Sequence, residues 1–226
     1  MVYKMSKDNN FFDNINTENK AYHLGFMFAD GNVSKTTNQI TLKLHSQDIE
    51  QIKAFKTDLQ LINKIAVHTC PKHIAYIQFY SHVTKQSLIK HGCVPCKSLI
   101  IKPPTNLPIT LVPHFIRGYF DGDGCISILT RSTNQYIVCS FDVCGTLEIL
   151  QWIKKSLGLT NKLYHTSNKN SYRLVTARTS SIINIHNYLY KDATIYLTRK
   201  KIKFDKALKL SQERIARNHH ALKLNN

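Results

Sequence analysis

The chain has 226 residues, 42% of them hydrophobic, so it is long enough to bury a core and is not expected to be disordered. Lys and Arg number 31 against 14 Asp and Glu, a formal net charge of +17. This excess is larger than solubility requires and predicts a polyanionic partner, bound more weakly as salt rises. The N-terminal segment has no signal-peptide run, and no stretch approaches the roughly 18 apolar residues of a membrane span. We therefore expect an intracellular protein with no membrane partner, in a compartment that composition does not identify.

Six cysteines are too few for a disulfide scaffold. Cys93 and Cys96 have C-x-x-C spacing, but a zinc site would need a second pair, and the other four cysteines lack matching spacing. The sequence therefore predicts reduced thiols and assigns no role to this pair.

The first predicted elements run from an apolar helix in HLGFMFADGNVS, residues 23–34, to a proline-containing linker. Two strands around a turn are expected over 32–46, an amphipathic helix over 48–60, a second strand pair at 64–69 and 75–80, a helix over 81–92 and a basic segment over 96–102. Pro103, Pro104 and Pro108 disfavour regular structure, so residues 99–112 are interpreted as a linker.

The first segment after the linker repeats the apolar segment before it at a constant offset of 93 residues, as between Gly25 and Gly118, and the elements that follow recur in the same order. IRGYFDGDGCIS, residues 116–127, aligns with residues 23–34, and strands and helices are expected over 125–143, 146–158, 162–166, 172–177 and 180–190, followed by a basic segment at 199–204. The repeat predicts an α/β (α+β) fold with two pseudo-symmetric α-β-β-α-β-β-α halves. Their boundaries are placed at 15–98 and 113–208, with a basic C-terminal tail at 209–226.

Small residues lie four apart in each apolar helix, Gly25 with Ala29 and Gly118 with Gly122. They share a helix face, which would let two helices approach closely. Glycine inside a helix costs about 1 kcal/mol relative to alanine, and close contact is a reason to keep it. The glycines that follow the two helices, at 31 and 124, are expected in the left-handed conformation that ends a helix.

Asp30 and Asp123 lie at the C-terminal ends of the two apolar helices, where the helix dipole disfavours a carboxylate by about 0.3 to 1 kcal/mol. Helices held side by side would also bring the two like charges together. A divalent cation between them relieves both costs, and oxygen ligands suit Mg²⁺, which often acts on phosphates. A single helix that ends in Asp-Gly is usually a core helix followed by a turn. The presence of two such helices favours a functional site. A calcium loop starting at Asp121 is excluded, because Cys125 and Ser132 would occupy two ligand positions.

HLGFMFADG and IRGYFDGDG resemble the paired motifs of the single-chain LAGLIDADG homing endonucleases, and the likeness covers residues 15–208. The resemblance implies two central packed helices, saddle-shaped antiparallel sheets in the DNA major groove, and catalytic Mg²⁺, replaceable by Mn²⁺, bound by Asp30 and Asp123. It implies a monomer that cleaves both strands of double-stranded DNA at a long pseudo-palindromic site and leaves 3′ overhangs. Three positions depart from the motif without putting catalysis in doubt, and we expect the helices to tolerate them: Phe28, His23 and Arg117.

The family also places a basic residue near the scissile phosphate after the last helix of each half, which matches Lys97 and Lys200. Strand alternation predicts the side chains that face DNA. In the first half these are Gln39, Thr41, Lys43 and His45, opposite Ile40, Leu42 and Leu44; in the second they are Arg131, Tyr136, Ser140 and Asp142, with Val138, opposite Ile137, Cys139, Phe141 and Val143. An ordinary half-solvated sheet would show the same alternation.

Two other functions fit the same fold: an RNA maturase that helps its host intron to splice, and a DNA-binding regulator without catalysis. Loss of the motif aspartates would favour either one. Both aspartates are present, which favours the enzyme without separating it from a maturase that also cuts. The sequence identifies neither the target and source organism nor the host element, be it intron, intein or free-standing gene.

Overall fold

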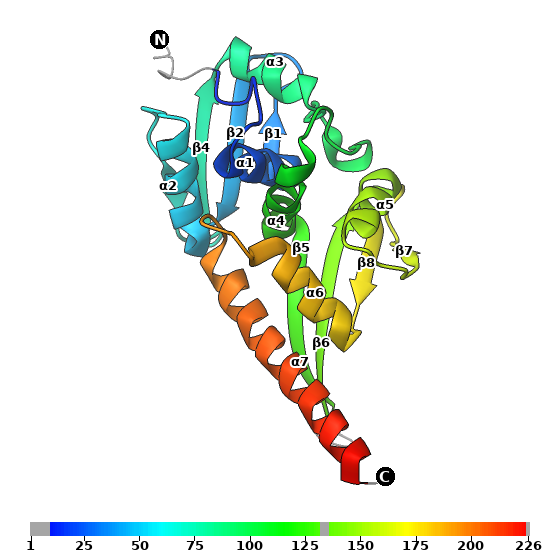
Figure 1. Ribbon diagram of the computed structural model, residues 1–226. Helices are drawn as coiled ribbons and strands as arrows, with labels where there is room; N and C mark the ends of the chain where they lie inside the picture. The colour runs from blue at the N-terminus through cyan, green and yellow to red at the C-terminus, as the bar shows by residue number, and fades with distance from the viewer. Residues whose placement is uncertain (1–9, 132–135, 225–226) are drawn as a thin grey trace.

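The structure, a computed structural model, describes residues 10–131 and 136–224, apart from the side chains of residues 131, 136 and 218–224. The first half comprises α1 (Glu18–Ala29), β1 (Gly31–Val33), β2 (Gln39–His45), α2 (Ile49–Asp58), β3 (Ala66–His68), β4 (Ile74–Tyr80) and α3 (His82–Lys90). The second comprises α4 (Val112–Asp123), β5 (Gly124–Arg131), β6 (Tyr136–Gly145), α5 (Leu147–Ser156), β7 (Leu163–His165), β8 (Tyr172–Thr176) and α6 (Thr179–Tyr190), followed by α7 (Thr198–Leu224). The predicted fold class is confirmed. Residues 209–224, predicted as a tail, continue α7 (Figure 1).

Each half contains one four-stranded antiparallel sheet, with strand orders β1-β2-β4-β3 and β5-β6-β8-β7. The registers also correspond, because Gly31 pairs with Leu42 and Gly124, 93 residues later, pairs with Val143. In each half the residue after the motif aspartate is the first residue of a strand. The backbone is therefore duplicated, and each central helix leads directly into its sheet.

Helices α1 and α4 pack together at the centre of the molecule (Figure 1). A Cβ atom on Gly25 would lie 2.0 Å from the carbonyl oxygen of Phe115, and one on Gly118 would lie 2.0 Å from that of Tyr22. The obstructing atoms are backbone, which cannot move aside as a side chain can. The two glycines thus set the separation of the two helices.

The glycines after α1 and α4 are not left-handed, contrary to the prediction. Gly124 is extended, with φ −102° and ψ 165°, and Gly31 has no positive φ. They are required for a different reason: a Cβ on Gly31 would lie 2.6 Å from the carbonyl oxygen of Met27, and one on Gly124 would lie 2.1 Å from a ring carbon of Phe120. Steric contact with the preceding turn excludes a side chain here.

One face of each sheet packs against helices, with α2 on β2 and β4 in the first half, and α5 on β6 and β8, α6 on β6, and α7 on β5 and β6 in the second (Figure 1). The predicted inward side chains are buried: Ile40, Leu42, Leu44, Cys139, Phe141 and Val143. Ile137 is an exception, because it is 37% exposed. It lies near the start of β6, where the strand extends beyond the core.

Two motif departures, Arg117 and His23, are buried and contact specific acidic partners, so they are more than tolerated substitutions; burial lowers the pKa of His23. Arg117 is fully buried and donates to Glu18 at 2.5 Å and to the carbonyl oxygens of Leu189 at 2.6 Å and Ile195 at 2.9 Å. Glu18 begins α1, so this cluster joins the two halves. His23, also fully buried, lies 2.7 Å from Asp58. Removing Glu18 would cost about 3–5 kcal/mol, because the charge of Arg117 would stay buried.

All six cysteines are free, which agrees with the predicted reduced thiols. Cys93 is buried and its thiol lies 3.5 Å from the carbonyl oxygen of Met27, whereas Cys96 is exposed. Among the described residues, no helix combines the length and apolar character needed to cross a membrane.

Candidate functional site

Asp30 and Asp123 lie at the adjoining C-terminal ends of α1 and α4. Asp30 is the C-cap residue of α1, and Asp123 is the last residue of α4. A Cβ atom on Gly122 would meet the Cβ of Ala29 at 2.2 Å and a carboxylate oxygen of Asp30 at 3.0 Å. The Asp30 carboxylate therefore lies against the last turn of α4, beside the residue that precedes Asp123.

Both aspartates hold protons more tightly than ordinary aspartates do. Burial raises the pKa of Asp30 to about 6, with a further contribution from the charge of Asp123. Burial also raises the pKa of Asp123. The Asp123 side chain reaches solvent, but the surrounding protein limits its hydration. The free site thus disfavours two negative charges, and a bound cation would favour them.

Lys97 and Lys200 bind the C-terminal carbonyl groups of the two central helices. The Lys97 ammonium lies 3.1 Å from the carbonyl oxygen of Ala29 and 2.5 Å from that of Gly31. The Lys200 ammonium lies 2.6 to 3.2 Å from four carbonyl oxygens, those of Phe120, Asp121, Gly122 and Gly124. Both side chains are buried. Each lysine thereby satisfies carbonyls that a helix end leaves unpaired and offsets the negative end of its dipole.

The two lysines also act on the aspartates. For Asp30, Lys200 lowers the pKa more than Lys97 does, and for Asp123 the order is reversed. Each aspartate is therefore influenced most by the lysine of the other half. The site depends on both halves, since neither half alone supplies the aspartate and its main opposing charge.

The donor set fits a hard divalent cation. Carboxylate oxygens are ligands of Mg²⁺, which commonly takes one or two carboxylates and completes its coordination with water and substrate phosphates. Within the described ranges, no cluster of three or more His, Cys, Asp or Glu side chains is arranged to hold a metal ion. Asp30 and Asp123 would therefore leave positions open for phosphate oxygens and water.

Asp121, at the motif's first acidic position, joins the two halves near the site. It is buried and accepts hydrogen bonds from the hydroxyl of Tyr22 at 2.8 Å and the backbone N–H of Leu197 at 2.7 Å. Phe28 is the repeat equivalent of Asp121, and Phe115 is the equivalent of Tyr22. These two residues form an apolar pair, with ring centroids 5.0 Å apart. The pseudo-symmetry is thus broken at this position, and Asp121 acts as a structural residue.

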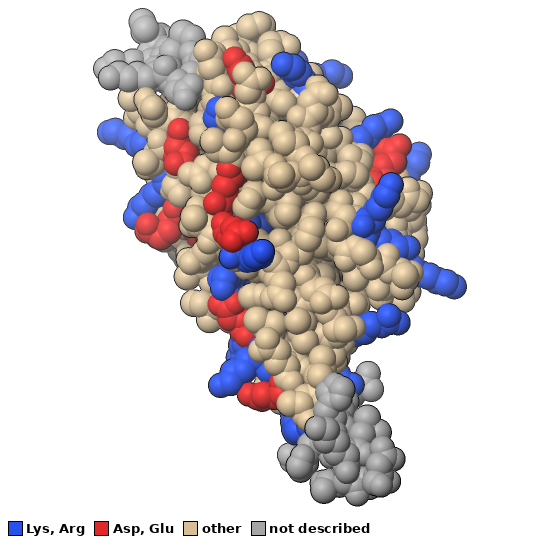
Figure 2. All heavy atoms as spheres, viewed as in Figure 1, with Lys and Arg blue, Asp and Glu red and all other residues tan. Residues whose placement is uncertain are grey.

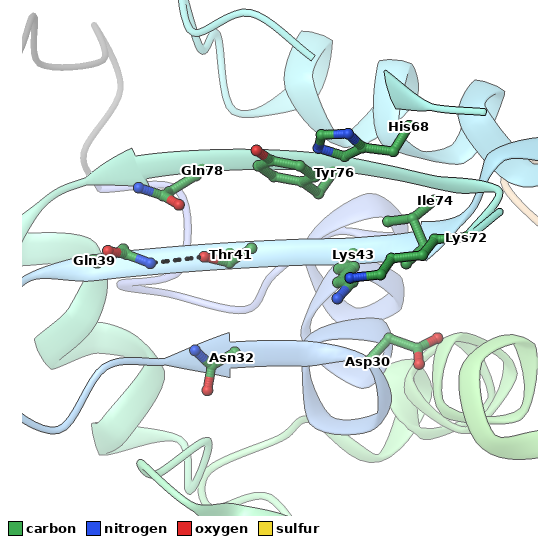
Figure 3. Close-up of a pocket in the computed structure, with 10 residues that line it drawn as sticks. All are labelled: Asp30, Asn32, Gln39, Thr41, Lys43, His68, Lys72, Ile74, Tyr76 and Gln78. Atoms are coloured by element: carbon green, nitrogen blue, oxygen red, sulfur yellow. Dashed lines mark hydrogen bonds between the residues drawn. The ribbon is translucent and has the colours of Figure 1, made fainter. Parts of the chain in front are cut away.

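The outward face of the first sheet forms a groove of about 590 Å³ that begins at Asp30 (Figure 3). Ten residues line it: Asp30, Asn32, Gln39, Thr41, Lys43, His68, Lys72, Ile74, Tyr76 and Gln78. The Gln39 amide donates to Thr41 at 3.3 Å and accepts from the Tyr80 hydroxyl at 3.0 Å. The groove thus presents hydrogen-bond donors and acceptors beside the paired aspartates.

Three of these groove residues, Gln39, Thr41 and Lys43, were among the predicted DNA contacts. Five further polar residues line the groove but were not among the predicted contacts: Asn32, His68, Lys72, Tyr76 and Gln78. Applying the same strand alternation to residues 74–80 would have found the last two. His45, the remaining predicted contact in this half, is exposed at the end of β2, where its ring stacks on His73 and accepts the backbone N–H of Gln47 at 3.3 Å.

The predicted contacts of the second half are less uniform. Ser140 is half-buried, and Asp142 is held by Arg173, which the sequence analysis did not single out. Arg131 and Tyr136 end β5 and begin β6, but their side chains lie outside the described part of the chain. The second sheet therefore differs in chemistry from the first.

Figure 2 shows the face on which the helices lie over the sheets. Acidic side chains are grouped along one side of this face, with basic ones mainly at its margins, and much of the centre is uncharged. This face does not present a continuous basic surface. On the outward face of the first sheet, by contrast, the groove contains two lysines and a histidine, and Asp30 is its one acidic residue.

Comparison with known proteins adds two findings. Residues 116–211 match a family model described as LAGLIDADG endonuclease. Solved structures that share the fold include LAGLIDADG homing endonuclease I-GzeII in complex with its DNA target, at 14% identity and a TM-score of 0.64, with 88% of this chain and 91% of that chain covered. Meganuclease I-SmaMI bound to uncleavable DNA is 13% identical with a TM-score of 0.65, and 92% of this chain and 93% of that chain are covered. LAGLIDADG meganuclease I-AabMI bound to uncleaved DNA is 14% identical with a TM-score of 0.59, and 85% of this chain and 91% of that chain are covered. Comparison with curated proteins gave no match.

The family match and the two-half fold place this protein in the class of DNA endonucleases. The matched half contains Asp123 and Lys200, and the other half repeats its backbone with Asp30 and Lys97 in the corresponding positions. The second half thus matches the LAGLIDADG endonuclease family over residues 116–211, and the first half repeats its fold.

Proposed function

We propose that the protein is a monomeric, divalent-metal-dependent homing endonuclease that hydrolyses both strands of a long pseudo-palindromic DNA site and leaves 3′ overhangs. The observation that carries the proposal is the convergence of Asp30 and Asp123 at adjoining helix ends, with their pKa values raised. Such a pair has no evident structural use, since it adds repulsion at the negative ends of two helices.

Asp30 and Asp123 would hold Mg²⁺, for which Mn²⁺ substitutes. When bound, the metal lowers the pKa of water and stabilises negative charge on phosphate oxygens. The two carboxylates would place that chemistry where α1 and α4 meet, between the two halves, so that one site could serve both strands. This role requires both carboxylates to be ionised.

Lys97 and Lys200 would act close to the scissile phosphates. Their ammonium groups already lie at the helix ends that carry the aspartates. From there they would stabilise charge that develops in the transition state, or orient the attacking water. Because both are also buried helix-end partners, their structural and catalytic contributions must be measured separately.

The sheet faces would bind the major groove, which admits two-stranded β-ribbons. The groove on the first sheet supplies amide, hydroxyl and ammonium groups beside Asp30, the arrangement expected if base contacts and cleavage share one surface (Figure 3). Similarly folded proteins have been crystallised with DNA, which supports DNA as the partner. An intracellular location and a role in intron homing follow from the same proposal.

Cleavage selection on a randomised double-stranded DNA library tests the proposal. The full-length protein is incubated with the library and Mg²⁺, and the cut ends are sequenced. We expect one long site with 3′ overhangs, and no cutting by a variant that carries both Asp30→Asn and Asp123→Asn. Binding without cleavage in Mg²⁺ and Mn²⁺ would instead indicate a DNA-binding regulator. Binding of intron RNA with faster splicing, and no DNA cleavage, would indicate a maturase.

A further inference from the structure

Arg173 and Asp142 form an ion pair on the outward face of the second sheet. Arg173 Nε donates to one carboxylate oxygen of Asp142 at 3.2 Å, and Arg173 Nη2 donates to the other. The Asp142 side chain is 17% exposed and that of Arg173 is 50% exposed. The carboxylate is therefore mostly covered, while much of the guanidinium faces solvent.

The pair lies near the metal-binding end of this sheet. Asp142 pairs in register with Cys125, two residues after Asp123, and Arg173 pairs with Cys144. Burial raises the pKa of the Cys144 thiol, and the charges close enough to shift it further include Asp142, Arg173 and Asp123. Arg173 is thus placed on the same face as the second aspartate, where DNA bound at the site would pass.

The geometry leaves one edge of the guanidinium free. Asp142 accepts from Nε and from one hydrogen of Nη2, so the remaining donors are the second Nη2 hydrogen and both hydrogens of Nη1. At the end of the guanidinium, one N–H bond of Nη1 and one N–H bond of Nη2 point outward and are parallel to each other. Two parallel donors match the O6 and N7 acceptors that guanine presents in the major groove. Adenine places a donor at one of these positions, and cytosine presents a donor instead of O6.

The first half has no equivalent pair. By strand register, Thr41 corresponds to Asp142 and Tyr76 to Arg173. The Tyr76 ring stacks on His68, with centroids 5.8 Å apart and an interplanar angle of 13°. At these equivalent positions a guanidinium fork is thus present on one sheet and a stacked aromatic pair on the other.

We propose that Arg173 is a specificity-determining residue that binds a guanine in the half of the DNA site covered by the second sheet, and that Asp142 is a positioning residue that orients its guanidinium. The proposal rests on the proposed endonuclease function and adds one base and two residue roles to it. Asp142 then contacts no base itself, and its charge is neutralised by Arg173 rather than turned toward the phosphates. The two half-sites differ at this base pair.

Binding selection on a randomised library tests these roles. The full-length protein carries Asp30→Asn, so that bound DNA is not cut, and is compared with the same protein carrying in addition Arg173→Ala, Arg173→Lys or Asp142→Asn. We expect the parent to select guanine at one position of one half-site. Arg173→Ala should lower the preference for that guanine by about tenfold or more and leave the other positions unchanged, and Arg173→Lys should lower it less, since lysine also donates to guanine.

Asp142→Asn should have a different signature. The guanine preference should fall severalfold, because the fork is no longer held, while affinity for unrelated sequences should rise, because the Arg173 charge is no longer neutralised and attracts the phosphates. Arg178→Ala is the matched control: this exposed arginine occupies the N-cap position of α6, two residues after β8, without a capping hydrogen bond from its side chain, and its loss should leave the base preferences unchanged. Thermal unfolding of each variant checks that the fold is retained.

Two outcomes would overturn the proposal. If Arg173→Ala leaves every base preference unchanged, the ion pair only joins two strands; if it lowers affinity equally for all sequences, Arg173 is a phosphate anchor. In both cases the parent still selects a defined site, so the endonuclease proposal stands. If the parent selects no site at all, both proposals fail.

Discussion

A single methyl group at the centre of the molecule should destabilise the whole fold. In Gly118→Ala the new Cβ would lie 2.0 Å from the carbonyl oxygen of Tyr22 and 2.9 Å from the backbone nitrogen of Phe26. Nonbonded heavy atoms attract at roughly 3.5 to 4 Å, so α1 and α4 must move apart by more than about 1 Å. Because these helices hold the two halves together, both halves should lose stability in one transition.

The magnitude follows from two opposing contributions. Overpacking a filled interior costs about 1–3 kcal/mol, and the upper part of this range applies where backbone must move. Alanine in place of glycine inside a helix returns about 1 kcal/mol. We expect a net loss of about 2 kcal/mol, or a fall in melting temperature of roughly 4 to 8 °C for a chain of this size. Gly25→Ala should cost the same, since its Cβ would lie 2.0 Å from the carbonyl oxygen of Phe115.

Calorimetry and denaturant unfolding measure this effect. The double variant should cost less than the sum of the two single variants, because one helix displacement relieves both contacts. Gly158→Ala is the control: its Cβ would meet nothing within 4 Å, so the cost of about 1 kcal/mol comes only from its φ of +63°. A Gly118→Ala protein as stable as wild type would refute the packing argument.

Four further predictions concern the site. Asp30→Asn or Asp123→Asn should abolish most cleavage but leave DNA binding largely intact, and cleavage at the wild-type rate by either variant would contradict a shared centre. Because the pKa of Asp30 is raised to about 6, affinity for Mg²⁺ or Mn²⁺ should fall as the pH drops through 6; calorimetric titration showing pH-independent affinity down to pH 5 would contradict this. The metal-free protein should lose stability as the pH rises from about 4 to about 6, because over that window the folded carboxyl holds a proton that the unfolded chain has released. Lys97→Ala or Lys200→Ala should lower the single-turnover cleavage rate of the bound complex more than the affinity for DNA. Each should also lower the free energy of unfolding by about 1–3 kcal/mol for every buried carbonyl left without a partner. Lys43→Ala should lower only the affinity for DNA. If Lys97→Ala and Lys200→Ala both lower only the affinity for DNA, these two lysines are phosphate anchors.

Much of the fold could be predicted from the sequence because its signals are local. Helix and strand periodicities and the Asp-Gly ends of the two apolar helices occupy short windows, and their repetition 93 residues apart turned weak motifs into a specific one. Strand alternation likewise predicted that Ile40 and Phe141 face the core. It was wrong at Ile137, because alternation assigns a face and says nothing of where the helical layer ends.

Partners that are distant in sequence were decided only by the tertiary structure. Arg117 and Glu18 are 99 residues apart, Lys200 and Phe120 are 80 apart, and no short-range pattern tells which polar groups meet across such separations. Composition alone makes a buried arginine or lysine improbable, since burying an unpaired charge is costly. The fold removes that cost, because it brings each buried cation to a carboxylate or to the carbonyl groups at a helix end. The sequence by itself determined the duplicated architecture and the two aspartates, and the packing of the halves decided which charges surround them.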